Sequence, residues 1–112
     1  MVDQFKTIQS VIVDGVLTAT INNPPINVMT RDLYVDLIPF FSQVASDDGV
    51  RVLVMESADP DFFIAHYDIE MILQAPIDAP ARKSQELNPF HQMCETVRTM
   101  PKPTIAKING RV

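Results

Sequence analysis

Residues 50–55 read Val-Arg-Val-Leu-Val-Met, a nearly continuous run of β-branched and apolar side chains. Such a run is typical of a strand that is covered on both faces, as in the parallel sheets of α/β proteins. Two further segments with strand composition precede this run and one follows it, with helical segments between them. Because strands that alternate with helices form such sheets, we expect an α/β architecture. The 112 residues accommodate one domain, over residues 1–112.

The chain begins with a predicted β-hairpin. Residues 6–13 and 16–21 both favour extended structure, and the Asp-Gly pair at 14–15 is a strong signal for a type I′ turn. Residues 22–25, Asn-Asn-Pro-Pro, end the second strand, because proline has no N–H to donate to a neighbouring strand.

The helices and the last strand are also predicted from spacing. Apolar residues at helical intervals predict a helix over 31–45 with Thr30 as its N-cap, and we expect Pro39 to kink or split it. A short helix should begin near Asp68, and residues 74–81 read as a surface loop. A longer helix should cover 84–99, where the Asn-Pro pair at 88–89 marks either its start or a break, and residues 103–108 read as a strand.

Several classes of site are excluded by residue content. Cys94 is the only cysteine, so a disulfide framework and a multi-cysteine metal site are excluded. His91 and Cys94 would share one helix face, but further ligands are lacking; we expect no metal, with Cys94 in the core as a small apolar residue. Because no apolar run approaches about 18 residues and residues 1–6 lack signal-peptide character, we expect a soluble, cytoplasmic protein without a membrane partner.

The formal net charge of −5 is unevenly distributed. Residues 1–80 carry 12 acidic and three basic side chains, whereas residues 81–112 carry two acidic and six basic ones. The acidic balance argues against nucleic acid as a partner, since binding there depends on neutralising phosphates. The basic side chains of residues 81–112 either keep a helix and strand ends solvated or face an anion smaller than a nucleic acid.

Residues 61–69, Asp-Phe-Phe-Ile-Ala-His-Tyr-Asp-Ile, are the segment in which chemistry is expected. An apolar stretch, a turn and a helix N-terminus would leave backbone N–H groups around residues 65–67 without intrahelical partners. Such donors suit an oxyanion. From these residues alone, however, Asp68 is simply an N-cap.

Three segments together resemble the amino-terminal part of the crotonase superfamily, the enoyl-CoA hydratase/isomerase family. Residues 14–16 and 21–24 resemble its opening strands, residues 47–54 with 63–69 its first oxyanion-hole segment, and residues 102–110 the strand that leads into its second. The resemblance implies crotonase-like ββα spiral repeats and an acyl-CoA thioester substrate, with no cofactor besides the coenzyme A that the substrate carries. It also implies a homo-trimer or a dimer of trimers.

The family's site maps onto two parts of this chain. The resemblance implies that two backbone N–H groups hold the thioester carbonyl, the first of them being the amide of Ala65. It also implies substrate contacts from Pro25 and Ile26 in the loop after the second strand, and from residues Ala65, His66, Tyr67, Asp68 and Ile69.

Two histidines have open roles. His66 stands where the family usually has glycine, and is either an acid/base group or a passive side chain that narrows the pocket or points to solvent. His91 lies on a helix from which some branches of the family send a histidine into the active site. A lone histidine on a helix is more often structural.

The family's second oxyanion glycine, its acid/base glutamates and its trimerising helices would follow Val112. We therefore expect a chain that is truncated before the second oxyanion-hole turn. Two functions stay open. One is an acyl-CoA enzyme that stabilises a thioester enolate, most simply an enoyl-CoA hydratase or isomerase. The alternative is a non-catalytic, truncated binding or interaction module of the same fold.

Overall fold

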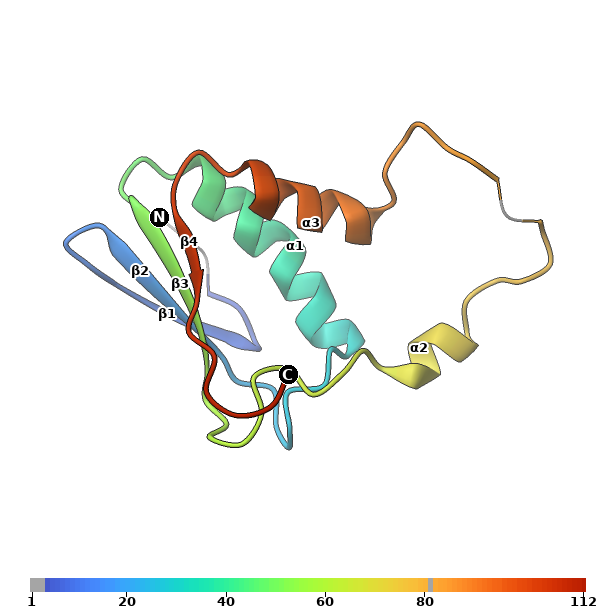
Figure 1. The fold of residues 1–112 in the computed structure, drawn as a ribbon, viewed down its shortest axis with the longest axis horizontal. Helices are drawn as coiled ribbons and strands as arrows, with labels where there is room; N and C mark the ends of the chain where they lie inside the picture. Colours follow the sequence, from blue (N-terminus) through green and yellow to red (C-terminus); the bar gives the residue numbers. More distant parts are fainter. Residues whose placement is uncertain (1–3, 81) are drawn as a thin grey trace.

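Four strands in the order β1-β2-β3-β4 form one sheet (Figure 1). The computed structural model describes residues 4–80 and 82–112. β1 (Ile8–Val13) pairs antiparallel with β2 (Val16–Ile21), and β2 pairs in parallel with β3 (Val52–Ser57), which pairs in parallel with β4 (Thr104–Ala106). The α/β expectation is confirmed, although β4 is shorter than the predicted strand over residues 103–108.

Helices connect the parallel strands. α1 (Arg31–Ser46) leads from β2 to β3, whereas α2 (Ile69–Leu73) and α3 (Pro89–Thr99) both lie between β3 and β4 in the chain. α1 and α3 contact each other, while α2 lies away from the sheet at the start of the long loop that leads to α3 (Figure 1). Residues 74–80 contain no helix or strand, as predicted for the loop, and residues 1–3 and 81 lie outside the described residues.

The predicted hairpin turn is confirmed by its backbone angles. Asp14 has φ 50° and Gly15 has φ 81°, and a type I′ turn requires positive φ at both central residues. Val13 therefore pairs directly with Val16 across the turn. This register places alternate residues of β2 toward the core.

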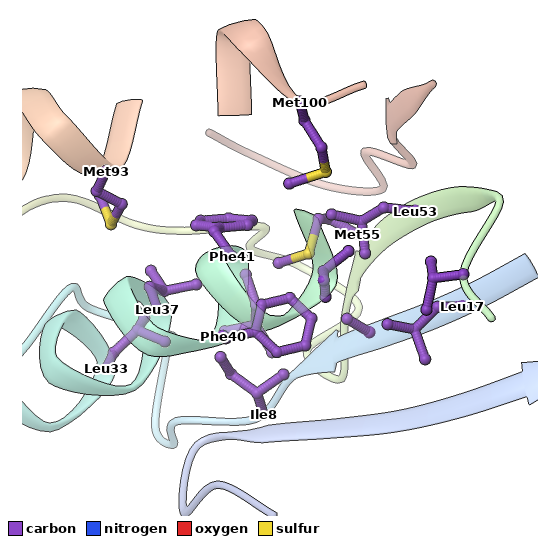
Figure 2. Packing of buried hydrophobic residues seen from close by; sticks show 14 residues of the cluster. Ile8, Leu17, Leu33, Leu37, Phe40, Phe41, Leu53, Met55, Met93 and Met100 are labelled. Atoms are coloured by element: carbon purple, nitrogen blue, oxygen red, sulfur yellow. The ribbon is translucent and has the colours of Figure 1, made fainter. Parts of the chain in front are cut away.

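The core lies between α1 and the sheet and is closed by two methionines from the α3 region (Figure 2). Phe40 is fully buried at its centre, and its ring contacts the ring of Phe41 edge to face at 5.5 Å between centroids. The buried side chains share the apolar spacing of their elements: Leu33, Leu37, Phe40, Phe41 and Val44 from α1, Leu17, Ala19 and Ile21 from β2, Leu53 and Met55 from β3, and Met93 and Met100.

Two expectations about burial were wrong. In β3, Leu53 and Met55 are buried but Val52 and Val54 are only half-buried, because the core covers one face of the strand rather than both. Cys94 is exposed, since its neighbour Met93 occupies the position on α3 that faces the core.

Helix boundaries settle two further alternatives. α1 continues through Pro39 and is not split. The carbonyl that Pro39 leaves without a donor belongs to Val35, whose side chain is 44% exposed, so water can reach that side of the helix. α3 begins at Pro89, and the Asn88 side chain caps it by accepting a hydrogen bond from the His91 N–H at 2.9 Å.

No helix within the described residues is long and apolar enough to cross a membrane.

Lys102 holds the end of α1 from a distant part of the chain. Its Nζ donates to the carbonyl of Val44 at 2.7 Å and to that of Asp47 at 2.9 Å. Both carbonyls lie at the C-terminal end of α1, where the last carbonyls of a helix have no N–H donor four residues ahead. The ammonium group therefore ties the segment between α3 and β4 to the C-terminus of α1.

We expect Lys102→Met to lower the free energy of unfolding by about 1–3 kcal/mol, because two hydrogen bonds from a charged donor are lost. The measurement is urea denaturation, with Lys107→Met as the matched control. Lys107 pairs with Glu56 at 3.1 Å, but its side chain is 69% exposed, so its loss should cost less. An equal or larger effect for the control would contradict this account of Lys102.

Candidate functional site

Residues 61–69, named here the site segment, connect β3 to α2 and are held by two parallel bridges. One bridge pairs Phe62 with Arg111, and the other pairs Tyr67 with Met29. Near the end of the segment, the Asp68 Oδ1 accepts a hydrogen bond from the Glu70 N–H at 3.0 Å. Asp68 is therefore the N-cap of α2, as its sequence position predicted.

Gly110 allows the chain after β4 to approach the site segment closely. It has φ 90°, and a Cβ placed on it would lie 2.5 Å from the carbonyl carbon and oxygen of Asp61. Such a distance to backbone cannot be relieved by moving a side chain. Arg111 then donates its N–H to the Asp61 carbonyl at 2.8 Å and accepts from the Phe63 N–H at 2.7 Å.

Asn27 is the polar centre of the site and is only 2% exposed. Its Oδ1 accepts from the Asn23 N–H at 2.7 Å, and its Nδ2 donates to the Ser57 Oγ at 2.7 Å. The same Nδ2 lies 3.2 Å from the carbonyl oxygens of Ile21 and Phe63. This set of bonds, the Asn27 network, joins the end of β2, the end of β3 and the site segment.

Sequence reasoning placed Asn27 in the loop after the second strand, which the resemblance implies cradles coenzyme A, but it gave the Asn27 side chain no structural role. A local signal exists, since Asn27 has φ 55° and asparagine tolerates this left-handed region better than most residues. The distant partners of its side chain have no such local signal, because Ser57 and Phe63 are 30 and 36 residues away.

The backbone N–H groups of the site segment differ in whether they have acceptors. The Ala65 N–H donates to the Asn27 carbonyl at 3.3 Å, and the Asp68 N–H donates to the Met29 carbonyl at 3.1 Å. The Tyr67 N–H has no acceptor among residues 4–80 and 82–112. The structure thus engages the amide that was predicted to be the oxyanion donor, and leaves free the amide two residues later.

His66 lies beside this free N–H and is exposed. Its Nδ1 is 2.8 Å from the Tyr67 carbonyl oxygen, and its own carbonyl accepts from the Met29 N–H at 2.8 Å. His66 therefore contacts Tyr67 through its ring and Met29 through its main-chain carbonyl.

Tyr67 forms an aromatic cluster with two other rings, those of Tyr34 and Phe90. Tyr67 meets Tyr34 of α1 and Phe90 of α3 edge to face, at 6.5 and 6.2 Å between centroids, and Tyr34 stacks on Phe90 at 6.3 Å. Burial raises the pKa of the Tyr34 hydroxyl, with smaller contributions from Tyr67 and Cys94. The cluster therefore joins both helices to the residue whose N–H is free.

Two of the predicted substrate-contacting residues, Pro25 and Asp68, line separate pockets. Pro25 lines a pocket of about 220 Å³ beside Asn27 and Ala58, whereas Asp68 lines another of about 380 Å³ with Arg31 and Met71. Ile26 is half-buried, and Ile69 is 60% exposed on α2. The described part of the chain contains no group of three His, Cys, Asp or Glu side chains that could hold a metal ion.

Comparisons with known proteins point to one family. The enoyl-CoA hydratase/isomerase family profile matches residues 12–112. The "probable enoyl-CoA hydratase" of Bacillus subtilis (strain 168) is 30% identical over 95 residues, which cover 85% of this chain and 36% of that protein. The alpha subunit of a fatty acid oxidation complex from Vibrio vulnificus is 31% identical over 93 residues, which cover 79% of this chain and 12% of the subunit.

Solved structures give the same picture. A candidate enoyl-CoA hydratase from Streptomyces avermitilis has a TM-score of 0.74 at 32% identity, covering 96% of this chain and 40% of that one. Pseudomonas aeruginosa DspI has a TM-score of 0.71 at 26% identity, covering 98% of this chain and 44% of that one. The chain thus spans well under half the length of these relatives.

We expect Asn27→Asp to lower the free energy of unfolding by about 3 kcal/mol or more at neutral pH, because a buried carboxylate would replace the donor that holds three acceptors. The difference in the free energy of unfolding between wild type and Asn27→Asp should become smaller as the pH falls, since protonation of Asp at position 27 removes the buried charge. Urea denaturation of Asn27→Asp measures this loss, with Asn22→Asp as the matched control. Asn22 is exposed, so the same chemical change there should have little effect on the free energy of unfolding. Similar losses for the two variants would contradict the role of the Asn27 network.

Proposed function

The chain belongs to the enoyl-CoA hydratase/isomerase family, and we propose that it binds an acyl-CoA thioester and stabilises the oxyanion formed at its carbonyl. The observation that carries this proposal is the Tyr67 N–H, which lies in the family's oxyanion-hole segment and has no acceptor among the described residues. A fixed backbone donor of this kind stabilises negative charge as it develops, with no cost of reorganisation during the reaction.

Tyr67 replaces Ala65 as the proposed donor. The Ala65 N–H is engaged with the Asn27 carbonyl, so it would have to break a bond of the fold before it could bind substrate. The bridge between Met29 and Tyr67 uses the carbonyl of His66 and the N–H of Asp68, which flank Tyr67. In a parallel pairing the N–H and C=O of the middle residue point to the opposite side. Tyr67 thus supplies one of the two donors that the family's oxyanion hole uses.

Hydration of a 2-enoyl thioester and migration of its double bond both pass through an enolate-like state. The proposed reaction is therefore that of an enoyl-CoA hydratase or isomerase, with coenzyme A as part of the substrate and no other cofactor. The names of the Bacillus and Streptomyces relatives support this reaction class. Assembly as a homo-trimer or a dimer of trimers, and a cytoplasmic location, belong to the same proposal.

A second candidate function is a non-catalytic binding module of the same fold. It is favoured by the carboxylates near the donor: Asp68 is used as the cap of α2 and Glu70 is exposed. Neither is positioned by a second contact, as an acid/base group usually is. This module would bind an acyl-CoA without converting crotonyl-CoA.

We expect an amide-to-ester replacement at Tyr67, which deletes the N–H and keeps the side chain, to lower kcat for crotonyl-CoA hydration by about 10²–10³-fold. The same replacement at Ala65 should mainly lower the free energy of unfolding, by about 1 kcal/mol, because it deletes the bond to Asn27. The measurements are the loss of enoyl absorbance and urea denaturation of each ester variant.

The two positions discriminate between the assignments. A large loss of kcat in the Ala65 ester variant, with none in the Tyr67 ester variant, would show that the Ala65 N–H is the oxyanion donor. Acyl-CoA binding without any conversion by the unmodified protein would support the binding module and overturn the enzyme.

A further inference from the structure

The contact of the His66 imidazole with Tyr67 determines which ring nitrogen carries the proton whenever the ring is neutral. Its Nδ1 lies 2.8 Å from the Tyr67 carbonyl oxygen, and a carbonyl oxygen can only accept a hydrogen bond. Nδ1 must therefore carry the proton in this contact. The lone pair of the neutral ring is then on Nε2, and the exposed side chain leaves that nitrogen accessible.

The same contact fixes the side of the site segment on which the ring lies. The Met29 N–H donates to the His66 carbonyl, and the Met29 carbonyl accepts from the Asp68 N–H, so the bridge lies on one side of the chain. The Tyr67 N–H and C=O point to the other side. Because the ring of His66 reaches the Tyr67 carbonyl, the imidazole lies on the side toward which the free Tyr67 N–H points.

We propose that His66 is the base that removes the α-proton of an acyl thioester whose carbonyl oxygen is bound by the Tyr67 N–H. This inference rests on the proposed function and names a residue for one of its steps. The α C–H bond breaks and its electron pair forms a double bond to the carbonyl carbon. The carbonyl π pair moves to the oxygen at the Tyr67 N–H, and the proton moves to Nε2.

The hydrogen bond from Nδ1 supports the charged product of this step. The imidazolium keeps its Nδ1–H bond to the Tyr67 carbonyl, so the ring does not have to turn when it gains a proton. Return of the proton to the α-carbon restores the thioester, which balances the step without a co-reactant. Base and oxyanion donor then belong to adjacent residues.

The charged neighbours of His66 leave its ring free for proton transfer. Asp68, on the same segment, caps α2, and it lines a pocket with Arg31 of α1 and Glu70 of α2. Residues 27–29, which pair with the segment, have no titratable side chain, and the phenols of Tyr34 and Tyr67 belong to the aromatic cluster. Arg111 bonds to the segment through its backbone and lies over the Phe62 ring. Within the described chain, none of these groups forms an ion pair with His66.

The test is hydrogen–deuterium exchange at the α-carbon of butyryl-CoA in D₂O, followed by mass spectrometry with the full-length protein. Butyryl-CoA has no double bond, so exchange reports proton removal alone. We expect His66→Asn to slow exchange by about 100-fold or more, because the asparagine amide can still donate to the Tyr67 carbonyl but cannot take a proton. The wild-type rate should fall on the acidic side of its pH profile, and this limb should be missing in the variant.

A second variant separates a chemical role from a structural one. Added imidazole should restore part of the exchange in His66→Gly, where the ring has been deleted. Exchange by His66→Asn at the wild-type rate and with the wild-type pH profile would overturn the proposal. Loss of the acidic limb in His91→Asn instead would assign the base to α3 and overturn it too.

The outcomes also separate this inference from the proposed function. Exchange that is lost in the Tyr67 ester but kept in His66→Asn would overturn His66 alone and leave the oxyanion donor in place. A wild-type protein that neither exchanges the α-proton nor hydrates crotonyl-CoA would overturn both. Matching thermal unfolding of His66→Asn and wild type would show that the variant is folded.

Discussion

The site depends on the hydrogen bonds made by the side chain of Asn27. One buried amide joins the end of β2, the end of β3 and the site segment, with its donor and acceptor atoms all engaged. Its main-chain carbonyl adds a bond from the Ala65 N–H. Burying an amide of this kind is favourable only when its hydrogen-bond partners are in place. The Asn27 side chain therefore favours one arrangement of the end of β2, the end of β3 and the site segment.

That arrangement determines which backbone groups are left for chemistry. With Ala65 bound to Asn27, and with His66 and Asp68 bound to Met29, the Tyr67 N–H is turned to the opposite side. The aromatic contacts of Tyr67 with Tyr34 and Phe90 join this residue to α1 and α3, which belong to the same packed unit as the sheet. A donor held from both sides in this way is preorganised, which is the property that oxyanion stabilisation requires.

The parts of the fold that follow from local chemistry were predictable from the sequence. Asp14-Gly15 supplied the two positive φ angles of its turn, and the side chains of Thr30 and Asp68 cap α1 and α2. The features that the sequence could not predict depend on neighbours distant in the chain. The exposure of Cys94 depends on which face of α3 meets α1, and the engagement of Ala65 depends on a pairing with residues 27–29 that its own segment does not encode. The family resemblance placed the expected oxyanion donor in the site segment, but only the hydrogen bonds distinguish the free Tyr67 N–H from the engaged Ala65 N–H.

The central claim is that the Tyr67 N–H polarises a thioester carbonyl. Difference infrared spectroscopy of an acyl-CoA labelled with ¹³C at the thioester carbonyl, bound to the protein, tests this most directly. The account predicts a carbonyl stretch at lower frequency than in water for the wild-type complex, and a shift back toward the solution value when residue 67 carries an ester in place of its amide. The same lowered frequency in both complexes would contradict it.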